Sequence, residues 1–202
     1  MINPKVVAEI RRAVARKQYE IADAGRLYLT AAKAFAGGVF EHSLNGGPWE
    51  LAPNLLPTQG RNFILDVALG ALAKQAAWYM APFATNTAPI AGLTAANFAA
   101  TQGEFKNYTA ATRALWTPDA SANGVQANTT TGITITIDDG TTFNQFDMYG
   151  LGLISSSAKG ATTGFLAACA LFLDGDGDPR PRMGLVETDV LGLRYTITLT
   201  SS

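Results

Sequence analysis

The stretch Gly132-Ile-Thr-Ile-Thr-Ile-Asp138 decides the fold class of this chain of 202 residues. Its three isoleucines alternate with two threonines, so the isoleucines lie on one face of a strand and the threonines on the other. One apolar and one polar face are typical of an antiparallel sheet that covers a core on one side. Asp139-Gly140 follows at once and predicts a turn.

The same alternation returns at residues 190–200, where Leu191, Leu193 and Tyr195 are separated by polar residues or glycine. Further strands are expected at 76–84, 104–116, 146–155 and 165–173. The segments between them are rich in Gly, Ser, Thr and Asn, which favours turns and loops. We therefore predict a mainly β fold, an antiparallel β-sandwich or jelly-roll domain.

A long N-terminal helix is predicted before the β domain, over residues 3–36. Pro4 suits the first helical position after an Asn3 cap, and Gly37-Gly38 predicts the helix end. An imperfect heptad gives this helix a narrow apolar stripe. We expect the stripe to form an assembly contact through Val7, Ile10, Val14, Ile21 and Tyr28. Packing of the stripe on the chain's own domain is the alternative.

Glycines and prolines between residues 37 and 57 predict a loop region that separates two parts of the chain. The expected parts are a helical arm with a Gly-rich linker at 1–46 and a β-rich domain at 47–202. A second, short helix is expected after Thr58, which is placed to cap it.

Composition points to a protein that contacts other proteins. Charged residues make up 15% of the chain, against roughly a quarter in a typical soluble domain. The net charge of −1 and the absence of a long basic run argue against direct nucleic-acid binding. Residues 1–33 contain seven basic and three acidic residues, a net of +4, so the remainder sums to −5. This asymmetry fits docking on an acidic protein surface, or a charged solvent face of the helix.

Membrane insertion and secretion are not expected. No apolar run approaches the roughly 18 residues that span a bilayer. The N-terminal segment lacks the uninterrupted apolar core of a signal peptide, because Arg11, Arg12 and Arg16 interrupt it. The single cysteine, Cys169, lies in an apolar stretch and is expected to be a buried small hydrophobic residue.

Catalytic and metal-binding patterns are weak. The single histidine, His42, is expected in a surface loop, and one His with one Cys cannot form a zinc site. Asp174-Gly-Asp-Gly-Asp178 resembles the start of a calcium loop, but Pro179 and Leu185 occupy the positions that need Gly and Glu. A solvated turn is expected there, with a low-affinity cation at a subunit contact as the alternative. No cofactor is predicted.

Four segments, taken in their order along the chain, carry a resemblance to a known family: Leu55-Leu-Pro-Thr-Gln-Gly-Arg-Asn-Phe-Ile-Leu-Asp66, Ala77-Trp-Tyr-Met-Ala-Pro-Phe83, Tyr108-Thr-Ala-Ala-Thr-Arg-Ala-Leu-Trp116 and Leu193-Arg-Tyr-Thr-Ile-Thr-Leu-Thr200. Together they resemble a family of tailed-bacteriophage virion proteins. The resemblance covers about residues 54–202, without the N-terminal segment. It implies a phage structural role, with capsid cement or decoration first, and it supplies no catalytic residues.

We therefore expect a non-enzymatic capsid cement protein that stabilises contacts between shell subunits. Its expected partners are the major capsid protein or other virion proteins, and further copies of itself in a homo-oligomer. Its expected location is the virion, after synthesis in the host bacterial cytoplasm. The alternatives are a tail, neck or fibre protein, a carbohydrate-binding module around Trp49, and a surface-glycan hydrolase that uses carboxylates.

Overall fold

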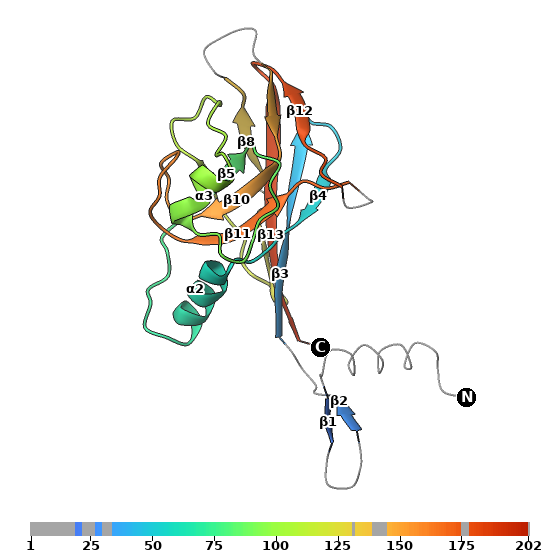
Figure 1. Cartoon of the computed structure of the whole chain (residues 1–202), viewed down its shortest axis with the longest axis vertical. Helices are drawn as coiled ribbons and strands as arrows, with labels where there is room; N and C mark the ends of the chain where they lie inside the picture. The colour runs from blue at the N-terminus through green and yellow to red at the C-terminus, as the bar shows by residue number, and fades with distance from the viewer. Residues whose placement is uncertain are drawn as a thin grey trace, which may run out of the picture. The chain divides into compact units, whose positions relative to one another are not determined.

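The computed structural model describes residues 19–21, 27–29, 34–130, 132–138, 145–174 and 178–201. The chain is mainly β, as predicted, and its strands pair antiparallel wherever the register is defined (Figure 1). It divides into two compact units, one of residues 1–35 with 199–202 and one of residues 36–198. In the smaller unit, β1 (Tyr19–Ile21) pairs with β2 (Leu27–Leu29).

Two main sheets build the larger unit. The first has the strand order β11-β10-β5-β6, with bounds Leu166–Leu171, Gly150–Ile154, Trp78–Phe83 and Ala114–Trp116. The second has the order β4-β3-β13-β7, with bounds Glu50–Pro53, Ala34–Leu44, Val190–Ser201 and Val125–Ala127. β8 (Ile133–Thr136) adds to β13, and β9 (Phe146–Met148) pairs with β12 (Arg182–Leu185).

The main hydrophobic core receives side chains from both sheets. Phe40 and Tyr195 come from the second sheet, with ring centroids 4.4 Å apart, and Met80 and Leu151 come from the first. All four are 1% exposed or less. Burying a large apolar side chain contributes about 1.5–3 kcal/mol, so this shared cluster is a main source of stability. The arrangement is consistent with the predicted β-sandwich.

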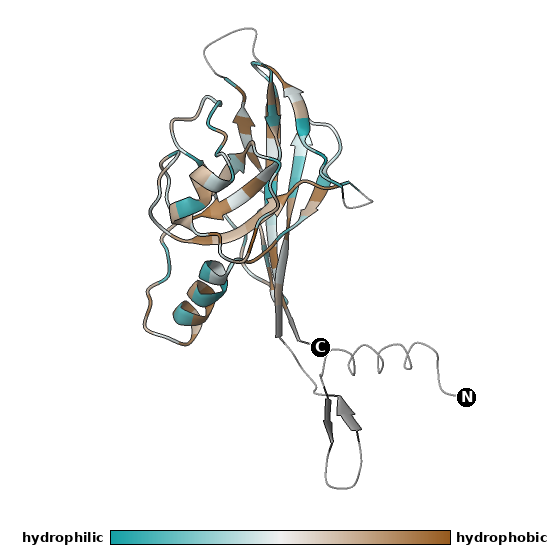
Figure 2. Cartoon of the chain, in the orientation of Figure 1, coloured by the Kyte–Doolittle hydropathy of each residue, from teal (hydrophilic) through white to brown (hydrophobic). Residues whose placement is uncertain are grey.

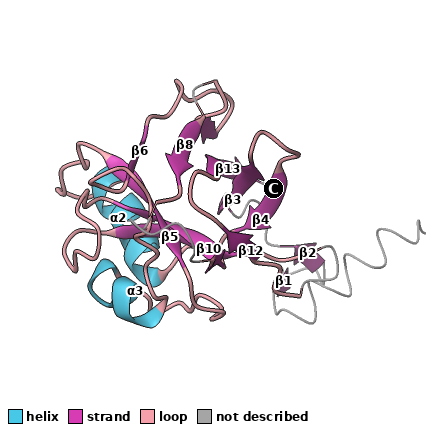
Figure 3. Ribbon diagram, turned by 90° about the horizontal axis from the view of Figure 1, so that it is seen from above, coloured by secondary structure: helices cyan, strands magenta, loops and turns pink. Residues whose placement is uncertain are grey.

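α3 (Ala95–Thr101) covers the outer face of the first sheet, and α2 (Thr58–Ala68) packs against β11 (Figure 3). Phe98 of α3 packs with Phe83 and Ile154 in a second apolar cluster. β10 is therefore buried at every position, because it has core on both faces. Figure 2 shows the resulting apolar colour along β10 and β11. Among the described residues, no helix has the length and apolarity needed to cross a membrane.

The alternating patterns at residues 133–137 and 190–200 predicted strands correctly. In β8 and just after it, Ile135 and Ile137 are buried, whereas Thr134 is exposed. In β13, Leu191 and Leu193 have no exposed surface, and they pair with β8. The stretch that decides the fold thus lies against the C-terminal strand, with the apolar faces of both toward the core.

The prediction of a helix over residues 3–36 is not confirmed. Residues 3–18 lie outside the described part of the chain, and the described residues of this segment form strands, with Ile21 of β1 opposite Leu27 of β2. Isoleucine and tyrosine, here Ile21 and Tyr28 at heptad spacing, suit strand pairing as well as a helix stripe. Gly25 also lowers the helix propensity of this segment by about 1 kcal/mol.

The loop predicted over residues 37–57 is also corrected, because it holds β3 and β4. Gly37 and Gly38 lie inside β3. A Cβ atom at Gly38 would press on the carbonyl oxygen of Thr196 and the ring of Tyr195. The glycine therefore marks a close approach of β3 to β13 and not a helix end. The two compact units divide between residues 35 and 36 and again between residues 198 and 199, whereas the expected parts were 1–46 and 47–202.

The short helix α3 was not predicted, since residues 85–103 were expected to form an extended loop. Thr94 begins a capping box: its backbone N–H donates to Oδ1 of Asn97 at 2.7 Å. The second helix appears where expected, but Pro57 is its N-cap and Thr58 its first residue. The hydroxyl of Thr58 instead accepts a hydrogen bond from Arg61 at 3.1 Å.

Candidate functional site

His42 is buried in the core, so the prediction of a surface loop is wrong. Strand β3 turns it to the same face as Phe40, and its exposed fraction is 1%. Its ring stacks on Phe172, with ring centroids 3.7 Å apart. Nδ1 accepts a hydrogen bond from Nε of Arg182 at 2.8 Å, which leaves the proton of a neutral imidazole on Nε2.

The electrostatics around His42 keep it neutral. Burial, and then the positive charges of Arg182 and Arg180, lower its pKa to about 3. Arg182 also pairs with Glu50 at 3.1 Å, so the group ties β3, β4 and β12 together. Ser43 donates its hydroxyl to the carbonyl of Gly47 at 2.7 Å, not to His42. These contacts hold three strands together. Because the imidazole of His42 is buried, it cannot contact a ligand in solvent.

A second buried charge cluster involves Glu104 and Arg113, whose side chains have no exposed surface. Both are satisfied by each other and by backbone groups of the loop at residues 155–164. Lys159 of that loop donates to the carbonyl of Tyr108 at 2.8 Å, and its Nζ lies 3.5 Å from the centroid of the Tyr108 ring. The cluster therefore holds a loop in place and leaves no carboxylate open to solvent.

One exposed apolar feature is what we call the α2 ridge, made of Leu65, Leu69 and Leu72. Their exposed fractions are 56%, 85% and 38%. The first two are four residues apart, which puts them on one face of α2 and its last turn. The opposite face of α2 packs on β11, because Gly60 lies directly against the backbone of Ala167. Exposed leucines gathered in this way are typical of protein contact surfaces.

Trp49, the candidate for carbohydrate stacking, already has a partner. The guanidinium of Arg194 lies 3.9 Å from the ring centroid, a cation–π contact. The ring also lies over Gly192, where a Cβ would approach it to 2.9 Å. With 37% of its surface exposed, Trp49 covers the outer face of the second sheet and presents only part of its ring to solvent.

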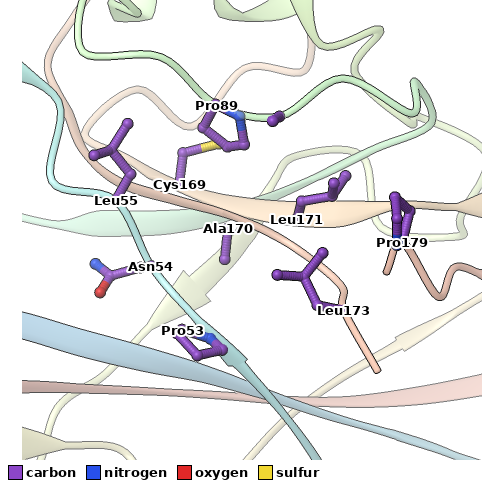
Figure 4. A pocket seen from close by; sticks show the side chains of 10 residues that line it. Pro53, Asn54, Leu55, Pro89, Cys169, Ala170, Leu171, Leu173 and Pro179 are labelled. Atoms are coloured by element: carbon purple, nitrogen blue, oxygen red, sulfur yellow. The ribbon is translucent and has the colours of Figure 1, made fainter. Parts of the chain in front are cut away.

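A pocket of about 420 Å³ opens beside β11, and we call it the β11 groove (Figure 4). It begins where the chain passes from β4 toward the first sheet. Leu55 exchanges backbone hydrogen bonds of 2.8 and 3.0 Å with Cys169 of β11. The lining is almost entirely apolar and comes from three segments: Pro53, Asn54, Leu55, Ala88, Pro89, Cys169, Ala170, Leu171, Leu173 and Pro179. Cys169 is fully buried, as predicted, and burial raises its pKa.

At one end of this groove, the described residues on either side of the Asp-rich segment's centre, 173–174 and 178–179, pair with each other. Leu173 pairs with Pro179 in an isolated antiparallel β-bridge, and the backbone N–H of Asp174 donates to the carbonyl of Asp178 at 2.9 Å. Oδ1 of Asp174 accepts the N–H of Asp178 at 3.0 Å. Residues 175–177 lie outside the described part of the chain, so the turn expected there stays a prediction. Among the described residues, no group of three or more His, Cys, Asp and Glu side chains is placed to hold a metal ion.

The predicted contact residues are not brought together as a helical stripe in the described part of the chain. Val7, Ile10 and Val14 lie outside it, and Ile21 and Tyr28 lie on the two paired strands β1 and β2. The α2 ridge was missed, although the spacing of its leucines was a readable signal. The β11 groove had no such signal, because its lining comes from three separate segments.

No protein-family model, curated protein or solved structure matches this chain.

Proposed function

We propose that this chain is a non-enzymatic virion structural protein, a capsid cement protein that binds the major capsid protein of a tailed bacteriophage. In the virion it would stabilise contacts between shell subunits. The observation that carries the proposal is the α2 ridge. Leu69, with 85% of its surface exposed, stands between two further exposed leucines. Burying an apolar surface of this kind against another protein is favourable, because its apolar area is removed from water.

The energetics of the ridge fit a protein that works by binding an assembled state. Covering one leucine that is largely exposed contributes about 1.5–3 kcal/mol before the costs of association. A ligand that binds only the assembled shell shifts the equilibrium toward it. Many copies on a symmetric shell make modest individual contacts sufficient. The partner surface is therefore expected to be apolar and repeated.

The remaining polar chemistry supports a structural role. Arg113 and Glu104 form a buried ion pair, and the buried ring of His42 stacks on Phe172. Both groups fix loops and strands in place, as a rigid scaffold for a binding surface requires. The low charge content of the chain supports the same conclusion, since the centres of protein interfaces are depleted of charged residues.

The experiment is co-sedimentation of purified chain with shells that lack it. Wild type is compared with the double variant Leu65→Glu, Leu69→Glu. The matched control is the double variant Ile90→Glu, Leu115→Glu. It adds the same charge at two positions outside the ridge, where Ile90 is 60% and Leu115 51% exposed.

We expect the ridge variant to lose at least about tenfold in shell affinity, because each added carboxylate must be desolvated at the contact. The control should bind as wild type does. Equal binding by the ridge variant would remove the ridge from the contact, and failure of wild type to bind any shell would overturn the proposal.

A further inference from the structure

We propose that a pocket between α2 and the two main sheets binds a trimethylammonium group, such as the one that choline carries. Four aromatic side chains line it, so we call it the aromatic pocket: Phe63, Trp78, Trp116 and Tyr195. It lies wholly within the larger unit of the chain. Three observations support this ligand, namely the arrangement of the rings, the uncharged lining and the size of the pocket. The inference does not depend on the proposed role in a shell.

The four rings form two pairs whose planes stand steeply to each other. Phe63 of α2 and Trp78 of β5 have ring centroids 5.2 Å apart and planes at 81°. Trp116 of β6 and Tyr195 of β13 have centroids 5.8 Å apart and planes at 65°. The corner between two such rings is bounded by the face of each, and ring faces carry the negative part of the aromatic quadrupole. A cation held among these rings is therefore attracted to them.

The lining favours a cation that brings no hydrogen-bond donor on its nitrogen. None of the described side chains that line the pocket is charged. The cation–π contacts of the described residues involve Tyr108 and Trp49, so no lysine or arginine among them occupies the pocket rings. An ammonium group with N–H donors would lose hydrogen bonds to water here, whereas a quaternary nitrogen has no N–H to leave unpaired. Nε1 of Trp116 is buried, so an occupant meets the carbon atoms of that ring.

The size of the pocket restricts the ligand to a small head group. Its volume of about 160 Å³ lies below the range of about 300–1,000 Å³ that is usual for drug-sized ligands. It is close to the cavity of about 150 Å³ that holds one benzene molecule, which is similar in bulk to a trimethylammonium group. Trp78 and Gln126 are partly exposed, so the rest of a ligand can leave the pocket beside them. The amide oxygen of Gln126 can accept a hydrogen bond from a hydroxyl such as that of choline.

The test is isothermal titration calorimetry of the full-length chain with two ligands of the same shape. One is choline, and the other is dimethylbutanol, its neutral isostere with carbon in place of the quaternary nitrogen. We expect choline to bind at least about tenfold more tightly, because only the cation is attracted by the ring faces. Equal or tighter binding of the neutral isostere would overturn the proposal and leave an ordinary apolar cavity. The absence of saturable binding of choline would also overturn it.

Two matched variants place the binding at the aromatic pocket. Trp78→Leu keeps an apolar side chain but removes one ring, and it should weaken choline binding at least about fivefold. Trp49→Leu makes the same change outside the pocket and should bind choline as wild type does. The chain has three tryptophans, so in Trp49→Leu both remaining ones line the pocket and their fluorescence should respond to choline. Equal choline affinity of the two variants would overturn the assignment, and the two-ligand comparison on wild type holds even if Trp78→Leu does not fold.

A further arm identifies the source of the trimethylammonium group, which occurs in soluble compounds and in lipid head groups. The chain is floated with phosphatidylcholine vesicles and, as a control, with phosphatidylglycerol vesicles. Flotation with the first alone, together with choline binding, would assign the group to a lipid. Choline binding without flotation would assign it to a soluble compound. No shell is present in these experiments, so their failure is distinct from a failure of shell binding.

Discussion

Arg113 and Glu104 form a buried, two-pronged ion pair: Nε and Nη2 of Arg113 each donate to a different carboxylate oxygen of Glu104 at 2.8 Å. Neither side chain has any exposed surface. Arg113 also donates to the carbonyl of Ser156 at 2.9 Å, and Glu104 accepts the backbone N–H of Gly160 at 2.8 Å. The pair therefore anchors the loop at residues 155–164 as well as itself.

Replacing Arg113 with methionine should destabilise the fold by about 3–5 kcal/mol, because it leaves the carboxylate of Glu104 buried without its partner. Urea unfolding followed by tryptophan fluorescence measures this loss. Arg61→Met is the matched control, since Arg61 is exposed on α2, and it should change stability by no more than about 0.5 kcal/mol. A loss below about 1 kcal/mol for Arg113→Met would contradict the assigned geometry.

The free energy of unfolding should fall as the pH is lowered from about 6.5 toward 3, because His42 binds a proton more readily in the unfolded chain. Its pKa is about 3 in the folded chain and about 6.5 when unfolded, so the unfolded state binds the extra proton between these values. The contribution is fully present above pH 6.5 and is lost progressively toward pH 3, by about 1.4 kcal/mol per pH unit. Burial is the main cause, followed by Arg182 and Arg180.

The matched variant is His42→Asn, which keeps an acceptor for Arg182 and cannot titrate. We expect it to be less stable than wild type at pH 7, through loss of the stack on Phe172, but to lose less stability on acidification to pH 4.5. Unfolding curves at several pH values give both slopes. Parallel slopes for the two proteins would show that His42 is not the neutral, buried group described above.

The fit of α2 on β11 depends on Gly60. A methyl group there would meet the carbonyl of Ala167 at a distance that atoms do not adopt. Gly60→Ala should therefore cost about 1–3 kcal/mol, despite the better helix propensity of alanine. Gly37→Ala is the control, because nothing lies within 4 Å of its added Cβ. If thermal unfolding places Gly60→Ala at or above wild type, the packing of α2 is not as described.

Local alternation made the sheet predictable, whereas long-range contacts did not leave a readable pattern. Ile135 and Ile137 are buried because their spacing matches the strand period, a property of a few adjacent residues. His42 is buried by Arg182 and Phe172, more than a hundred residues away in the chain. The sequence around the single histidine, which lies between two pairs of glycines, does not indicate which distant residues will pack against it.

The predicted N-terminal helix is not confirmed, and the described residues 19–21 and 27–29 form strands for a different reason. Apolar residues seven apart, such as Ile21 and Tyr28, satisfy a heptad, and the same residues also suit the paired strands β1 and β2. Among the surfaces, the spacing of Leu65, Leu69 and Leu72 allowed the α2 ridge to be predicted in principle. The groove beside Leu171 depends on three chain segments meeting, which only the structure shows.

The measurement that tests the central claim most directly is the copy number of this chain in purified particles, by quantitative mass spectrometry against the major shell protein. A capsid cement protein that uses the α2 ridge on repeated shell sites should be present in an amount comparable to that of the shell protein. A few copies per particle would instead fit a neck or tail protein. Complete absence from the particles would contradict a role in the virion.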